Sequence, residues 1–128
     1  MSTKSLTLAL LITAAGSVAA HAENMIDAQG LKATPSSVTV GTVAIDKMGY
    51  IVVHESKDGN PGPVLGHEMI EAGKSQDVSV KLDQQAKAGS ELIVMLHSEG
   101  DADKKFDAKG DPPVMSGGKI VMESVTVQ

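Results

Sequence analysis

The chain has 128 residues, a formal net charge of −5, no cysteine and no arginine, and its only aromatic side chains are Tyr50 and Phe106. The lack of cysteine excludes disulfide bonds and a lipidated N-terminal cysteine. An acidic chain with two aromatic rings and no arginine has few groups that bind phosphates or stack on bases, so we exclude nucleic acid as a partner.

The first 22 residues have the features of a secretory signal peptide. Lys4 provides the positive charge, residues 6–12 are mostly apolar, and residues 20–22 read Ala-His-Ala, the small-x-small pattern that signal peptidases accept. The apolar run is shorter than the roughly 20 residues of a membrane-spanning helix, and no other such run follows. We therefore expect an exported protein, periplasmic or extracellular, without a membrane span after processing. We predict cleavage after Ala22; cleavage after Ala20 would leave His21 as the N-terminus, whose amine and imidazole chelate copper.

The mature chain divides into residues 23–36 and one domain, residues 37–128. The first segment contains Pro35 and little periodicity, so it is a leader or a strand that is added late. In the domain, apolar segments that either alternate with polar residues or form short continuous runs, both typical of strands, are separated by turns rich in glycine and proline. These segments are residues 37–40, 43–45, 50–53, 63–70, 78–82, 92–96 and 119–127.

The phase of the alternation changes after Gly41, which predicts a bulge there. The continuous apolar run at residues 92–96 predicts a buried central strand, and residues 83–88 are too short a helical segment for more than a turn. Six or seven strands without crossover helices predict an all-β fold. We expect a small antiparallel β-sandwich of Ig-like or cupredoxin-like type with about seven strands, in preference to a small barrel.

Two segments carry a resemblance to a known family. They are residues 49–55, Gly-Tyr-Ile-Val-Val-His-Glu, and residues 59–67, which end in Pro-Gly-Pro-Val-Leu-Gly-His. Together with residues 71–73, 77–82, 95–97 and 110–114, they resemble a family of uncharacterised β-sandwich domains found in exported bacterial proteins and repeated in archaeal cell-surface proteins. The resemblance covers about residues 38–127. It implies a setting at the envelope or cell surface and carries no known activity.

Three histidines remain in the mature chain, His54, His67 and His97, and we consider them as copper or zinc ligands. Imidazole suits both metals, and the methionines near these histidines add a soft thioether that favours copper. However, if residues 50–54, 64–70, 77–82 and 91–97 are four strands joined by three reversals, the first and last are antiparallel. His54 and His97 would then lie at opposite ends of the sandwich. The alternative is that the histidines are hydrogen-bonded residues that cap strand ends.

A separate cation site is predicted in the acidic loop that follows His97. Its carboxylates alternate along the chain as they do in calcium loops: Glu99, Asp101, Asp103 and Asp107. Lys104 stands at the sixth position, where calcium loops have glycine for a sharp turn, and its charge opposes a cation. The resemblance also predicts glycine where Lys104 and Lys105 stand, so a solvated polar loop is the alternative.

No motif in the sequence predicts catalysis. There is no Gly-x-Ser-x-Gly element, no cysteine nucleophile and no His-Glu-x-x-His helix. We therefore expect a non-enzyme, an exported envelope domain that binds an unknown protein or envelope component. The alternative is a metal-binding protein that uses copper, zinc or calcium at the residues named above.

Overall fold

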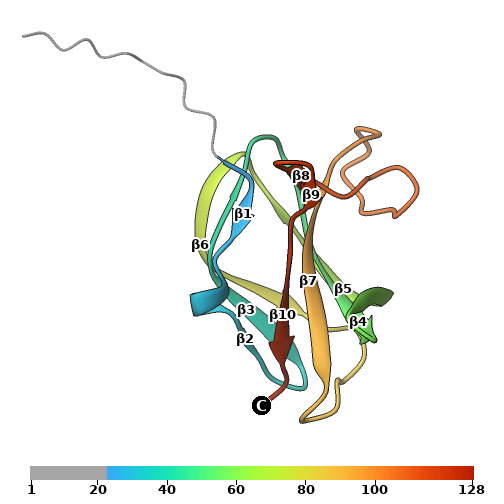
Figure 1. Cartoon of the computed structure of the whole chain (residues 1–128). Helices are drawn as coiled ribbons and strands as arrows, with labels where there is room; N and C mark the ends of the chain where they lie inside the picture. The colour runs from blue at the N-terminus through green and yellow to red at the C-terminus, as the bar shows by residue number, and fades with distance from the viewer. Residues whose placement is uncertain (1–22) are drawn as a thin grey trace, which may run out of the picture.

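The computed structural model describes residues 23–128, and the predicted signal peptide, residues 1–22, lies outside the described residues. The described chain is a sandwich of two antiparallel sheets (Figure 1). Its elements in chain order are β1 (Met25–Ile26), the 3-10 helix η1 (Ala28–Gly30), β2 (Lys32–Ala33), β3 (Ser37–Ile45), β4 (Gly49–Lys57), β5 (Asn60–Ile70), β6 (Gly73–Lys81), β7 (Glu91–Ser98), β8 (Met115–Ser116), β9 (Lys119–Ile120) and β10 (Met122–Thr126). Within this part of the chain no helix has the length and apolar character of a membrane span.

The prediction of an all-β antiparallel sandwich is confirmed. The described residues form ten strands instead of about seven. The additional strands are among β1, β2, β8 and β9, which have two residues each and are too short to show a period in the sequence. Residues 23–36, expected to be a leader or a late strand, supply β1, η1 and β2. Both of these strands pair with β3, so the segment is part of the first sheet.

In the first sheet β3 is central, since β6 pairs along one edge and β1 and β2 pair in succession along the other. The second sheet has the order β10-β7-β4-β5. The two sheets meet at one side of the sandwich, where Ala33 of β2 forms a parallel bridge with Val127. There the backbone N–H of Gln128 also donates to the Ala33 carbonyl at 2.9 Å. The chain end therefore joins the two sheets.

The core between the sheets is aliphatic. Its fully buried members include Val38, Val40, Val43 and Ile45 from β3, Val80 from β6, Ile51 and Val53 from β4, and Val94 and Leu96 from β7. Burying one such side chain contributes about 1.5–3 kcal/mol relative to leaving it exposed. The predicted central strand is confirmed, since β7 lies between β4 and β10 and is buried along most of its length.

Strand β3 changes the face that it turns to the core at Gly41. Core residues occupy even positions before Gly41 and odd positions after it, as the sequence predicts. The predicted one-strand bulge is wrong, because pairing with β6 keeps the same register on both sides. Asp77 on β6 has a φ of 53°, so both strands turn over together at this point. A Cβ on Gly41 would lie 2.8 Å from the Cα of Gly30, which explains why both positions are glycine.

The role of the core can be tested at Leu96, which is fully buried in β7. Replacing Leu96 by alanine leaves a cavity between the sheets, and we expect it to lower the free energy of unfolding by about 2–5 kcal/mol. The matched control is Ile120→Ala, because Ile120 in β9 is 42% exposed, and the change should be within about 0.5 kcal/mol. Chemical denaturation measures both values, and equal losses for the two variants would contradict the assignment of the core.

Candidate functional site

The second sheet buries residues on both of its faces. Alternate residues of β4 and β7 point into the core, and the residues between them point outward, away from the first sheet. Six of these outward residues are nevertheless buried, each with 8% or less exposed: Tyr50, Val52, His54, Ile93, Met95 and His97. Cross-strand partners share a face, so β5 adds Val64, His67 and Met69 and β10 adds Met122. We call this set of residues the outer face.

Phe106, from the loop between β7 and β8, covers part of the outer face. Its ring centroid lies 5.1 Å from that of His97, 5.2 Å from that of His67 and 5.5 Å from that of Tyr50. Tyr50 in turn meets His67 edge-on, with centroids 6.2 Å apart. Both aromatic rings of the chain therefore lie together with the histidines, outside the aliphatic core.

The loop that carries Phe106 is held in place by the buried carboxylate of Asp111. The backbone N–H groups of Gly100 and Asp107 donate to its two oxygens at 2.8 and 2.7 Å. Burial alone would raise the pKa of Asp111, but these two hydrogen bonds outweigh it and hold the pKa below its ordinary value. Asp111 is therefore ionised at neutral pH and ties together residues that are four and eleven positions away.

Backbone carbonyls determine the tautomers of His54 and His97. Nδ1 of His54 lies 2.8 Å from the Gly62 carbonyl oxygen, and Nδ1 of His97 lies 2.7 Å from the Asp111 carbonyl oxygen. A carbonyl oxygen only accepts, so each Nδ1 carries the proton and donates it. In the neutral rings, each Nε2 then has a free lone pair. Both Nε2 atoms are buried and have no hydrogen-bond partner among the described residues.

The two imidazole rings lie close together, with centroids 5.8 Å apart and planes 25° from parallel. Burial lowers the pKa of His97, and the nearby His54 lowers it further, although the hydrogen bond to the Asp111 carbonyl opposes both effects. His97 is therefore neutral at neutral pH. Its buried Nε2 therefore carries a lone pair to which no described group donates a hydrogen bond.

The expectation that His54 and His97 lie apart is wrong, although the strand directions behind it are right. β4 and β7 are antiparallel, and His54 is paired with Ile93 while His97 is paired with Tyr50. The strands are direct neighbours, however, and both histidines stand on the same face only four residues apart in register. Their side chains span this separation, so the rings meet above the sheet.

His67 does not join the other two histidines as the three-histidine prediction requires. It is exposed on β5 and packs against Tyr50 and Phe106. In the described part of the chain, only one group of three or more histidine, aspartate or glutamate side chains has its donor atoms within 4.8 Å of one another. This group is Glu99, Asp101 and Asp103. The histidines therefore form a close pair, His54 and His97, while His67 packs against Tyr50 and Phe106.

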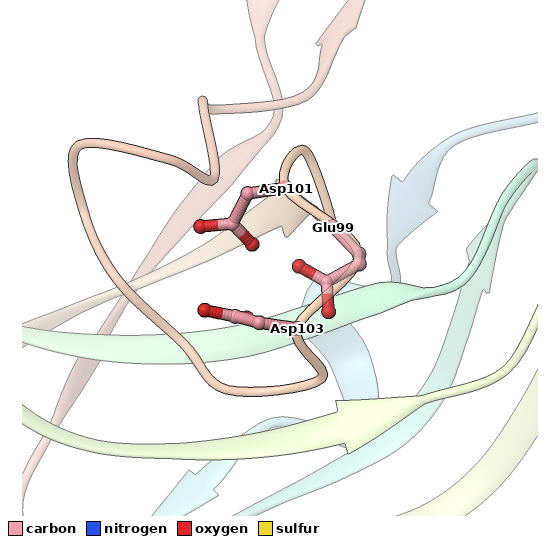
Figure 2. A group of neighbouring side chains, drawn as sticks. All are labelled: Glu99, Asp101 and Asp103. Atoms are coloured by element: carbon pink, nitrogen blue, oxygen red, sulfur yellow. The ribbon is translucent and has the colours of Figure 1, made fainter.

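The acidic loop gathers three of its four predicted ligands. Glu99, Asp101 and Asp103 bring their carboxylates together on one turn (Figure 2). Asp107 does not belong to this group, because its carboxylate accepts from the N–H of Lys109 and its own N–H donates to Asp111. Lys104, at the position where calcium loops have glycine, adopts the left-handed conformation with a φ of 59°. Calcium binding stays a prediction.

Hydrogen bonds connect this acidic turn to the outer face. One carboxylate oxygen of Glu99 accepts from the Tyr50 hydroxyl at 3.0 Å and from the backbone N–H of Lys104. Partial burial and the neighbouring Asp111 carboxylate raise the pKa of Glu99. Burial and the Glu99 carboxylate also raise the pKa of Tyr50. The turn is therefore a crowded acidic group that holds a proton more readily than isolated carboxylates do.

Four residues of this region were not predicted from sequence as part of a site: Tyr50, Phe106, Asp111 and Met122. The aromatic pair could have been found from composition, since these are the only aromatic side chains and both lie next to histidine-bearing segments. Met122 follows from pairing, because β10 places it directly beside Met95. Nothing in the local sequence marks Asp111 as buried.

Residues 24–128 match the family model described as Domain of unknown function (DUF7282). The chain belongs to this family. The family of uncharacterised domains predicted from the resemblance is thereby confirmed.

Two relatives of this DUF7282 domain are Cell surface glycoprotein 2 and Cell surface glycoprotein 1 of Haloarcula hispanica. Each is 28% identical over 94 residues, which is 72% of this chain and 10% of the relative. The chain thus spans about one-tenth of the length of these relatives. No solved structure matches it.

The anchoring role of Asp111 predicts a pH-dependent effect of Asp111→Asn. The asparagine amide carries no charge and can accept from only one of the two N–H groups, those of Gly100 and Asp107. Because hydrogen bonds to charged groups contribute about 1.5–3 kcal/mol, the free energy of unfolding at pH 7 should be lower than in the wild type by about 1–3 kcal/mol. Because the folded pKa of Asp111 is depressed, its contribution is complete above roughly pH 4 and is lost as the pH falls through the folded pKa.

We therefore expect the wild type and Asp111→Asn to converge in stability as the pH falls below the ordinary range of an aspartate pKa, as measured by chemical denaturation. Hydrogen exchange at the amides of Gly100 and Asp107 should accelerate in the variant. Asp46→Asn is the control, because Asp46 is exposed and lies outside this loop. A difference between the wild type and Asp111→Asn that stays constant with pH would contradict the role of the charge.

Proposed function

We propose that this domain is an exported, non-catalytic module of the cell envelope that binds a protein segment at its outer face. The relatives named as cell surface glycoproteins support the setting. Since the match occupies about one-tenth of each relative, the domain is one small part of those larger chains. In this proposal the domain contributes binding to a partner and not catalysis.

The observation that carries the proposal is a hollow of about 340 Å³ at the edge of the outer face. It is lined by Tyr50, His67, Glu68, Met69, Lys104, Lys105 and Phe106. Its rings and thioether offer contact area to an apolar side chain, and its two lysines attract a carboxylate beside it. Aromatic rings and methionine are enriched in protein interfaces for this reason. The occupant that fits is an acidic protein segment with an apolar anchor.

The proposal that the domain is not an enzyme has separate support. A second hollow, of about 600 Å³, is lined in part by Ser56 and Glu91, and the Ser56 hydroxyl donates to the Glu91 carboxylate at 2.8 Å. A carboxylate that accepts this proton holds the serine in place, but no histidine lines the hollow to act as a base. The free Nε2 atoms of His54 and His97 are buried, and in the described chain neither forms a hydrogen bond with a serine hydroxyl.

The binding surface can be tested with a photo-crosslinking amino acid placed at Met69 on the outer face. The matched control is the same substitution at Ile120, because the two side chains are 41% and 42% exposed and Ile120 does not line the hollow. In the native envelope, we expect position 69 to cross-link to one defined protein and position 120 not to do so. The partner is identified by mass spectrometry, and binding is repeated with the purified partner.

Replacing Lys104 and Lys105 by serine should weaken binding to the purified partner and reduce its salt dependence, because the two lysines supply the attraction for acidic groups. Equal adducts from positions 69 and 120, or none from either, would refute the proposed surface. A partner that binds as well to the double lysine variant would refute the acidic segment.

A further inference from the structure

We propose that His54 and His97, with Met95 beside them, bind one copper ion as Cu(I). The starting observation is a pair of unsatisfied atoms. In the described chain, three buried side-chain nitrogen or oxygen atoms lack a hydrogen-bond partner, and two of them are the Nε2 atoms of this pair. A buried polar atom without a partner is costly, and native proteins contain few of them. Two such atoms on adjoining rings require an explanation.

The hydrogen bonds of both rings match those of metal-ligating histidines. Such histidines usually donate the second ring N–H to a carbonyl or carboxylate, which fixes the tautomer and the ring orientation. His54 does this with Gly62 and His97 with Asp111. Histidines that only cap strand ends, the alternative considered from sequence, would explain the Nδ1 bonds. They would leave both Nε2 atoms unexplained.

The separation of the rings fits one ion between them. An ion bound to both Nε2 atoms at about 2.0–2.1 Å would hold the two ring centroids roughly 5–6.5 Å apart. The observed separation is 5.8 Å. The two rings are therefore close enough to share one ion.

Met95 supplies a third donor of the kind that selects copper. It is 3% exposed, stands on the outer face in β7 and pairs with Val52 of β4. In the register of the two strands, the Met95–Val52 pair lies midway between the pairs that contain His54 and His97. Thioether and imidazole donors in a dry site favour Cu(I), whereas calcium and magnesium need oxygen ligands.

The acidic turn at residues 99–103 is a different site with different chemistry. Its donors are carboxylate oxygens, and the turn is largely exposed. His67 is also outside the proposed copper site, since its contacts are with Tyr50 and Phe106. This leaves His67 as a matched control that has the same side chain on the same face.

The test is a competition for Cu(I) between the protein and a chromogenic chelator, with ascorbate present to keep copper reduced. The processed chain beginning at Glu23 is used, so that His21 does not contribute. We expect the wild type to take up one equivalent of copper. His54→Ala and His97→Ala should each lower the affinity at least 10-fold, Met95→Leu should lower it by a smaller factor, and His67→Ala should leave it unchanged.

A second measurement does not depend on the folding of the variants. In ¹⁵N-labelled wild-type protein, Cu(I) should shift the Nε2 resonances of His54 and His97 and leave that of His67 in place. No uptake of copper, an equal effect of His67→Ala, or uptake of Zn(II) in preference to Cu(I) would overturn the assignment. The inference is independent of the proposed partner, because copper uptake and cross-linking from position 69 are measured separately.

Discussion

The buried carboxylate of Asp111 is the contact on which the outer face depends. A sheet in a two-layer sandwich has one face on the core and one toward water, yet here the outward residues of β4 and β7 are buried as well. Part of their cover is the loop after β7, which brings Phe106 against Tyr50 and His97 and has almost no regular structure to hold it. Instead, the Asp111 carboxylate holds the loop with two charge-assisted hydrogen bonds from the backbone, which are stronger than neutral ones. Phe106 is positioned over the histidines because the backbone on both sides of it is tied to this one carboxylate.

The aliphatic residues that stabilise the fold and the polar and aromatic residues that could bind a ligand thus lie in two different layers. The layer between the sheets holds only aliphatic side chains and depends on tight packing. The layer outside the second sheet holds both aromatic rings, the histidines of the described chain and a buried aspartate. Buried polar groups cost free energy unless they are paired. The aliphatic layer provides the stability that allows two Nε2 atoms to stay unpaired, and local departures of this kind are expected where a protein binds something.

The sequence predicted the strands that apolar patterns along the chain mark, but not the features that depend on contacts between distant residues. Alternation correctly marked β3 and β6, and the β-branched run at residues 50–53 marked β4. The unbroken apolar run at residues 92–96 correctly marked β7 as a strand covered on both faces. The edge strand β5 begins at Asn60, earlier than predicted, because an edge strand tolerates Pro61 and Pro63. β1 and β2 have no period of their own and form only because β3 offers them an open edge. The histidine pair was missed because strand direction places backbones, whereas long side chains on one face can close a separation of four residues.

Asp111 also links His97 to the acidic turn. Its carbonyl oxygen orients His97, and its carboxylate positions Gly100 at the start of the acidic turn. The turn reaches the same face through Glu99 and the Tyr50 hydroxyl. Side-chain changes at Asp101 or Asp103 alter the acidic group but leave the backbone that holds His97 in place. A change that moves the backbone at Asp111 moves both. The proposed copper ligand His97 and the acidic turn are therefore chemically separate but share one support, whereas His54 is held independently by the Gly62 carbonyl.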